Sequence, residues 1–172
     1  MIHDYVIELP WLEGIIDFEA LKANYPYHLN DNDPWRGVQC YHVTYDQKEV
    51  RDFMDKFHDN PNWSNAPTYW LTHSLKDAWL SPHIDELRDA TVIFPIEPKT
   101  HTIHFLENLD DENSIVYSHD YKSPCMPHAK LPHMVKDKEV DRWFFQISYH
   151  IKDYSWKRVN ELISSKAILS ID

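Results

Sequence analysis

Residues 142–148 read Arg-Trp-Phe-Phe-Gln-Ile-Ser and have the strongest strand pattern near the C-terminus. A period of two places Arg142 and Ser148 on one face and Phe145 and Ile147 on the other. If the arginine that starts so aromatic a strand is buried, its guanidinium needs an anionic partner. We therefore predict a core strand that presents a guanidinium on one of its faces.

Other short segments rich in β-forming residues precede this one. Beyond residue 60 the predicted strands are 67–73, 91–96, 100–106, 114–118 and 142–151, and turn-forming clusters at 108–113 and 122–127 separate them. Two further strands are predicted at 5–9 and 38–45. There is no alternation of strands with helices and no glycine-rich phosphate loop, which argues against a nucleotide-binding fold. So many short strands predict an antiparallel sandwich or jelly roll.

Helices are predicted mainly before this run of strands. Asp17 is a candidate N-cap for a helix to about residue 25, and 46–58 has apolar residues at helical spacing. A final helix is predicted at 155–166. With 172 residues we expect a single domain over 1–172, in which residues 1–60 support a β core at 67–151.

The composition narrows the classes of partner. The chain has 28 acidic and 17 basic residues, a formal net charge of -11, so we expect neither nucleic acid nor an anionic membrane surface as a partner. Its two cysteines, Cys40 and Cys125, form neither a disulfide framework nor a zinc motif. No signal peptide or membrane-spanning run is recognisable. These features predict a soluble, cytoplasmic protein.

One segment, Ser81-Pro82-His83-Ile84-Asp85, has a pattern typical of a metal site. On extended backbone His83 and Asp85 project from the same face, where an imidazole and a carboxylate can occupy adjacent corners of an octahedral metal. The apolar stretch 90–96 follows, as expected for a ligand pair at the end of a strand. The alternative is a surface turn in which Asp85 accepts a hydrogen bond from a backbone amide.

A third ligand would come from a later strand. The candidates are His101, His104, His119, His128, His133 and His150. We favour His133, because it lies in the apolar stretch 131–135 after a turn and precedes Arg142. His128 is the main alternative. Two imidazoles and one carboxylate leave three metal positions open, as in non-haem Fe(II) oxygenases, and a nearby guanidinium suits a cosubstrate carboxylate.

With Arg88, the strand 92–96, residues 131–135 and Arg142, the His-Ile-Asp motif resembles the 2-oxoglutarate/Fe(II)-dependent dioxygenase superfamily. The likeness covers roughly residues 67–150 and is nearest to small aspartyl/asparaginyl and prolyl hydroxylase-like members, including short phage and bacterial ones. It implies a double-stranded β-helix, a jelly-roll or cupin-like core, and a hydroxylase that uses Fe(II), 2-oxoglutarate and O2.

The resemblance also implies roles for individual residues. His83, Asp85 and His133 would be the catalytic iron ligands, and Arg142 would bind the distal carboxylate of 2-oxoglutarate. Some aspartyl hydroxylase-like members lack the Asp ligand, which is present here. Where many members have a small polar residue two positions after the arginine, this chain has Phe144.

The substrate is expected to be a small molecule, an amino acid or a peptide side chain. Arg88 is a candidate for gripping a substrate carboxylate, or else forms a surface ion pair with Glu86 or Asp89. Trp70 and Trp79 either shape the substrate cavity or pack in the core. Two other functions stay open: a cupin-like metalloprotein that does not use 2-oxoglutarate, and a non-catalytic jelly-roll binding or structural protein.

Overall fold

The computed structural model describes residues 4–24, 38–42, 68–76, 78–96, 99, 102–136, 140–150, 156, 157 and 161. The larger sheet consists, in spatial order, of β1 (Val6–Glu8), β8 (Cys125–Pro127), β5 (Arg88–Pro95), β10 (Arg142–His150), β3 (Thr68–Ser74) and β2 (Val38–His42). The smaller sheet consists of β4 (Trp79–His83), β9 (His133–Lys136), β6 (Thr102–Leu106) and β7 (Ile115–Asp120). Every pairing among these strands is antiparallel.

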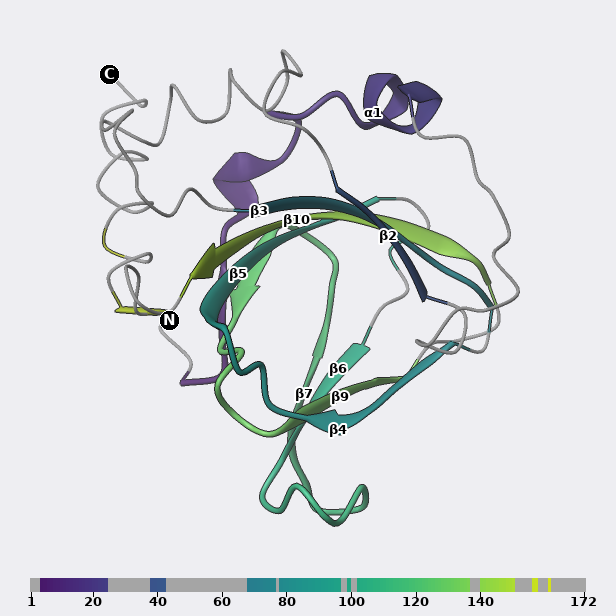
Figure 1. Ribbon diagram of the computed structural model, residues 1–172. Coiled ribbons are helices and arrows are strands. Elements are labelled where there is room, and N and C mark those ends of the chain that lie inside the picture. Colours follow the sequence, from purple (N-terminus) through teal and green to yellow (C-terminus); the bar gives the residue numbers. More distant parts are fainter. Residues whose placement is uncertain are drawn as a thin grey trace.

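The two sheets face one another, and the chain passes between them repeatedly (Figure 1). From β3 onward β4 lies in the smaller sheet, β5 in the larger, β6 and β7 in the smaller, β8 in the larger, β9 in the smaller and β10 in the larger. This alternation defines a jelly roll, as the sequence predicted. It places the ends of β4, β5, β9 and β10, which are distant in sequence, around one interior.

A first apolar core covers the outer face of the larger sheet. Phe145 and Ile147 of β10 pack there with Leu71, Val92 and Phe94, among other buried residues. The 3-10 helix η1 (Pro10–Leu12) and the helix α1 (Phe18–Asn24) cover this face, as Figure 1 shows for α1.

The predicted N-cap is confirmed, because the Asp17 carboxylate accepts the Ala20 N–H at 3.0 Å. The predicted helix 46–58 lies outside the described residues. Of the predicted helix 155–166, residues 156, 157 and 161 are described, and all three are helical. Among the described residues no helix is long and apolar enough to span a membrane.

A second apolar core lies between the sheets. It contains Ile93 of β5, Val135 of β9, and Ile103 and Phe105 of β6, with Phe144 of β10 packed against it. Because β10 alternates, Arg142, Phe144, Gln146 and Ser148 face this interior, and Phe145 and Ile147 face the outer core. The predicted division of this strand into two faces is therefore confirmed.

The predicted turn cluster 122–127 contains a strand. Residues 125–127 form β8, which pairs with β1 and contacts β5 at Cys125. Three residues next to prolines are too few for an alternating pattern to stand out in the sequence. Cys125 is a buried free thiol, and three strands separate β8 from β2, which carries Cys40.

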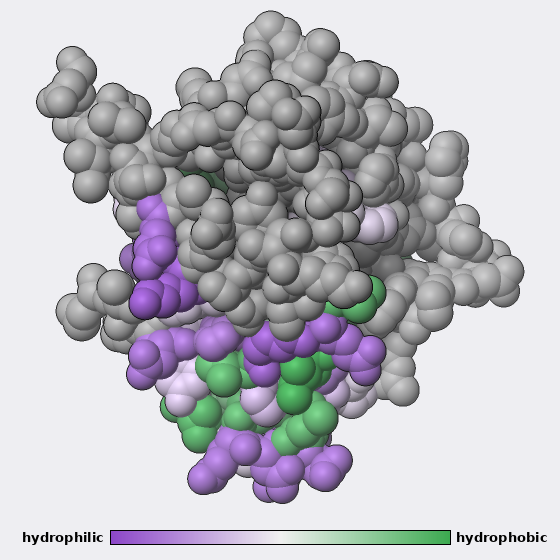
Figure 2. Space-filling view, turned by 60° about the vertical axis from the view of Figure 1, so that its left-hand side comes forward, coloured by the Kyte–Doolittle hydropathy of each residue, from purple (hydrophilic) through white to green (hydrophobic). Residues whose placement is uncertain are grey.

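The β6–β7 hairpin carries exposed residues at its tip. Asn108 and Asp111 accept backbone N–H bonds from Asp110 and Asn113, which makes the tip a solvated turn, as predicted. The neighbouring apolar residues Leu109, Ile115 and Val116 are also exposed. Figure 2 shows apolar surface bordered by hydrophilic side chains at the end of the molecule where this hairpin projects.

Candidate metal centre

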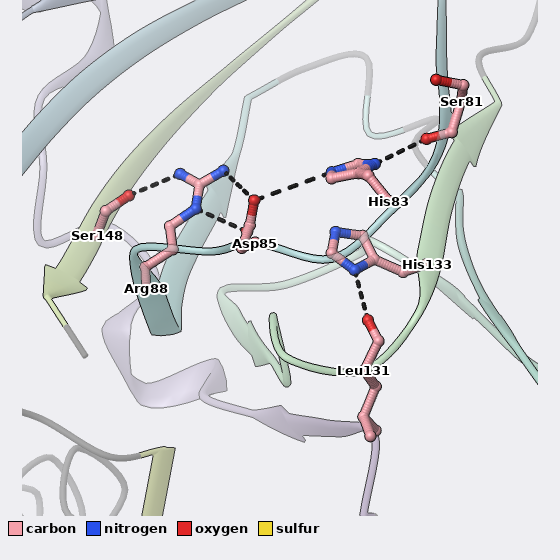
Figure 3. A network of polar contacts seen from close by, with 7 residues as sticks. All are labelled: Ser81, His83, Asp85, Arg88, Leu131, His133 and Ser148. Atoms are coloured by element: carbon pink, nitrogen blue, oxygen red, sulfur yellow. Dashed lines mark hydrogen bonds and ion pairs between the residues drawn. The ribbon is translucent and has the colours of Figure 1, made fainter. Parts of the chain in front are cut away.

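Three potential metal ligands meet at one end of the interior. His83 ends β4 and pairs across the smaller sheet with His133, which begins β9. Asp85 lies in the turn between β4 and β5, where its backbone N–H donates to the Ala129 carbonyl at 3.1 Å. The ligand atoms of the three side chains lie within 4.8 Å of one another, and Figure 3 shows them pointing toward a common point. They are close enough to share one ion.

Backbone carbonyls orient both imidazoles. His83 Nδ1 lies 2.7 Å from the Ser81 carbonyl oxygen, and His133 Nδ1 lies 2.8 Å from that of Leu131. A carbonyl oxygen can only accept, so each Nδ1 carries the proton and donates it. Each Nε2 then keeps its lone pair, and His83 Nε2 lies 3.9 Å from Asp85 Oδ1. This is the tautomer in which a histidine binds a metal through Nε2.

His133 is the more enclosed of the two histidines. Its side chain is 6% exposed, and its ring lies 4.3 Å from that of His83 and 6.2 Å from that of Phe105, centroid to centroid. Burial, and to a smaller extent the neighbouring His83, lower the pKa of His133 to about 4. At neutral pH His133 is therefore uncharged, the state that metal binding requires.

The third candidate ligand, Asp85, is held by an arginine. Arg88 Nε donates to Asp85 Oδ2 at 2.7 Å and Nη2 donates to Asp85 Oδ1 at 3.1 Å, a two-pronged ion pair. Nη1 donates to Ser148 Oγ of β10 at 3.0 Å. This ion pair was not among the predicted contacts of Arg88, which were a substrate carboxylate and a surface ion pair with Glu86 or Asp89.

Arg142 lies at the other end of β10 and faces the same interior. It is 1% exposed, and its Nη2 donates to Ser74 Oγ of the neighbouring strand β3 at 3.4 Å. Burial lowers its pKa to about 9, while Tyr121 acts in the opposite direction. Burial also raises the pKa of Tyr121 well above its usual value, so this phenol stays neutral. Arg142 and Arg88 lower the pKa of Tyr121 and Asp85 raises it, so the phenol is within electrostatic range of charged groups at both ends of the interior.

The other predicted residues lie elsewhere. His128 stacks on Trp156 with ring centroids 5.0 Å apart, and His104 Nδ1 lies 2.8 Å from Ser118 Oγ. Trp79 pairs with Lys136, on the face of the smaller sheet opposite Leu80 and Val135 of the interior core. Trp70 shares the inner face of the larger sheet with Gln146. His101 and the side chain of His150 lie outside the described residues.

Sequence reasoning missed three residues of this interior. Ser148 shares the predicted face of Arg142, so the alternation of 142–148 was a sufficient signal. Tyr121 continues the inner-face alternation of Tyr117 and His119 just beyond β7. Nothing in the sequence around Ser74 indicates that it contacts Arg142, because this contact follows from the pairing of β3 with β10.

The donor set fits a divalent transition metal. Two neutral imidazoles and one carboxylate on one side are the ligands of non-haem Fe(II) oxygenases, which keep the remaining positions open. The buried guanidinium beside a neutral phenol fits a carboxylate, because an anion there would offset the cost of burying Arg142. The residues present thus fit both the metal and a dicarboxylic cosubstrate.

Comparison with known proteins supports the fold. The sequence matches no protein-family model and no curated protein. Among solved structures, HygX from Streptomyces hygroscopicus with nickel and 2-oxoglutarate bound is similar, with 10% identity over 87% of this chain and 84% of that chain and a TM-score of 0.54. HygX that also holds hygromycin B gives 12% identity, 87% and 83% coverage and a TM-score of 0.51.

A 2OG-Fe(II) oxygenase family oxidoreductase from Burkholderia pseudomallei is also similar, with 12% identity over 82% of this chain and 79% of that chain and a TM-score of 0.48. At this level of identity, the likeness to HygX shows that the two chains share a fold.

Proposed function

We propose that the protein is an Fe(II)- and 2-oxoglutarate-dependent oxygenase that hydroxylates a small molecule, an amino acid or a peptide side chain. The carrying observation is that His83, Asp85 and His133 present two imidazole nitrogens and one carboxylate oxygen within 4.8 Å of one another, beside a jelly-roll interior. The structure of HygX, with nickel and 2-oxoglutarate bound in the same fold, supports this proposal.

Each residue has a defined part in the proposed reaction. His83, Asp85 and His133 hold the iron, and Arg142 binds the distal carboxylate of 2-oxoglutarate. Fe(II) and 2-oxoglutarate, when bound, supply the chemistry that activates O2 and inserts a hydroxyl group into a C–H bond. The apolar core between the sheets excludes water from the inner side of the ligands, and the neutral Tyr121 offers a hydrogen-bond donor near Arg142.

The substrate approaches from the more open side of the centre. The side chains of His83 and Arg88 are 31% and 32% exposed, whereas His133 is 6% exposed. Ile84 and Leu87, on either side of Asp85 in the chain, are exposed apolar residues. These features favour a substrate with an apolar or neutral reacting group. We also propose a cytoplasmic location, where Cys40 and Cys125 stay reduced.

The test is visible absorption of the protein under anaerobic conditions with Fe(II), with and without 2-oxoglutarate. A broad band that appears only when both are present, and is absent in His83→Ala, is expected from an iron-bound 2-oxo acid. No band in the folded wild-type protein would contradict the use of 2-oxoglutarate.

The variant Arg142→Gln separates the proposal from a cupin-like metalloprotein that does not use 2-oxoglutarate. We expect it to bind the metal as the wild type does and to bind 2-oxoglutarate at least about tenfold more weakly, because a charge-assisted pair is lost. Equal 2-oxoglutarate affinity in both proteins would favour the cupin-like alternative.

A further inference from the structure

Arg88 is placed to control the carboxylate of Asp85. Its guanidinium uses Nε and Nη2 on the two carboxylate oxygens and Nη1 on Ser148 Oγ, so each of its three nitrogens donates to a neighbour (Figure 3). We propose that Arg88 is a positioning residue that fixes Asp85 so that a single oxygen, Oδ1, is offered to a metal held by His83 and His133. This inference rests on the proposed function.

The two oxygens of Asp85 are not equivalent. Oδ2 accepts the shorter bond, 2.7 Å from Nε, whereas Oδ1 accepts the longer one, 3.1 Å from Nη2. Oδ1 is also the oxygen that faces the histidines, 3.9 Å from His83 Nε2. The stronger hydrogen bond therefore engages the oxygen that points away from the histidines, because a shorter charge-assisted bond is the stronger one.

The orientation of the Asp85 carboxylate determines how many coordination positions of the metal stay open. A carboxylate that gave both oxygens to the metal would leave two positions of an octahedron after two histidines have bound, and one that gives a single oxygen leaves three. A bidentate 2-oxo acid and O2 together need three. The fork from Arg88 thus favours the arrangement that the proposed reaction requires.

Ser148 anchors the arginine to the larger sheet. It is a buried residue of β10, the strand that pairs with both β3 and β5, so Nη1 is held by a central element of the fold. Asp85, by contrast, lies in a turn. The hydrogen bonds from Arg88 to Ser148 and to Asp85 thus connect the carboxylate in the turn to the central strand of the larger sheet.

Arg88 has two opposite effects on metal affinity: its positive charge weakens binding, and its orientation of Asp85 strengthens binding. A positive charge near the site repels a divalent cation, so its removal through electrostatics alone would tighten binding. Loss of a group that orients a metal ligand instead weakens binding, typically by about 10- to 100-fold. The sign of the change therefore distinguishes the two effects.

The test measures Co(II) affinity and the visible spectrum of the bound Co(II). We expect Arg88→Ala to weaken Co(II) binding by about tenfold or more and to change the spectrum. Added methylguanidinium should restore both, since the Arg88 side chain is 32% exposed and its site is open to a small cation. Arg88→Lys, which keeps the charge and loses the fork, should also weaken binding.

Two variants serve as controls. Lys130, from the segment between β8 and β9, donates to the Glu86 carbonyl at 2.7 Å. Lys130→Ala therefore removes a positive charge next to the turn that carries Asp85 without touching Asp85, and we expect no weakening. Ser148→Ala removes only the anchor and keeps both bonds to Asp85, so it should weaken binding less than Arg88→Ala. Near-ultraviolet circular dichroism of the metal-free proteins checks that each variant is folded.

The outcomes separate this inference from the proposed function. Unchanged or tighter Co(II) binding by folded Arg88→Ala, or a weakening that methylguanidinium does not relieve, overturns the role of Arg88 and leaves the function standing. Failure of the wild-type protein to bind Co(II) overturns the proposed function and this inference with it.

Discussion

Because Arg142 is buried, the affinity for 2-oxoglutarate should depend on pH in a measurable way. Burial lowers its pKa to about 9, while Tyr121 stays neutral over the same range because its own pKa is raised. We expect the affinity for 2-oxoglutarate to be constant near pH 7 and to fall by up to about tenfold per pH unit above about 9, as the guanidinium loses its charge. Calorimetric titration of the Mn(II)-loaded protein from pH 7 to 10 measures this.

The titration of Arg142 does not itself destabilise the fold. Burial favours the neutral form of Arg142, so between its lowered pKa and its ordinary value the unfolded chain binds more protons than the folded one, and stability rises with pH. The folded protein therefore does not lose stability through Arg142 while its affinity falls. An identical fall in Arg142→Gln would show that another group controls the binding.

At the residue scale, the sequence predicts the three side chains that the fold brings together, but not the arginine that contacts one of them. The spacing of His83 and Asp85 is compatible with a surface turn as well, and it indicates a ligand pair only together with the apolar strand that follows. His133 stands out by its apolar surroundings and by the arginine that follows it. The fork between Arg88 and Asp85 depends on how the turn from β4 to β5 reverses the chain, which the sequence does not encode in a recognisable pattern. The bond from Arg88 to Ser148, sixty residues away, depends on tertiary geometry, so it could not be predicted either.

At the scale of elements, the two faces of β10 have different roles. One face packs in the outer apolar core, and the other lines the interior that contains the candidate site. Phe145 is 0% exposed and packs against the rings of Phe18, Tyr69 and Phe94 at centroid distances of 6.4, 6.3 and 5.8 Å. We expect Phe145→Ala to lower the free energy of unfolding by about 3–5 kcal/mol, because it leaves a cavity in the outer core. Urea unfolding followed by fluorescence measures the change.

The matched control comes from the next residue of the same strand. Gln146 is half-buried and faces the interior between the sheets, so Gln146→Ala should lower the free energy of unfolding by about 1 kcal/mol. Equal losses for both variants would contradict the separation of the two faces.

Helix α1 gives a second test at this scale. The Asp17 carboxylate accepts the Ala20 N–H at 3.0 Å, and α1 contributes the buried Leu21 to the outer core. Asp17→Ala should lower the free energy of unfolding by about 1 kcal/mol, whereas Asp17→Asn, which can still cap, should change it by a few tenths of a kcal/mol at most. The comparison is made by urea unfolding, and a larger loss in the asparagine variant would show that the charge matters more than the cap.

The strands that could be predicted are those with a run of β-forming residues long enough to show a pattern in the sequence. The strands at 91–96 and 142–151 appear as β5 and β10 with shifted ends, whereas β8 and β9, of three and four residues, were not identified as strands. Pro82 lies within β4 and Pro127 ends β8, and proline ordinarily marks a segment as a turn. Short strands next to proline are fixed by the sheet around them, which only the fold supplies.

For the whole molecule, the proposed metal centre joins parts of the chain that the jelly roll brings together. His83 and His133 come from two strands of the smaller sheet, and Arg88 links Asp85 to β10 of the larger one. A metal that binds only the folded arrangement must therefore stabilise the two sheets as a unit.

We expect Mn(II) at about 100 times its dissociation constant to raise the free energy of unfolding by about 2.7 kcal/mol. Thermal unfolding with increasing Mn(II) tests this, with a midpoint that should rise steadily in the wild type. His133→Ala should show no rise, because the site loses its most buried ligand. His128→Ala, which removes a histidine stacked on Trp156 outside the cluster, should respond to Mn(II) as the wild type does. An equal rise in His133→Ala would mean that the metal binds elsewhere, and an absent rise in His128→Ala would revive that histidine as the third ligand.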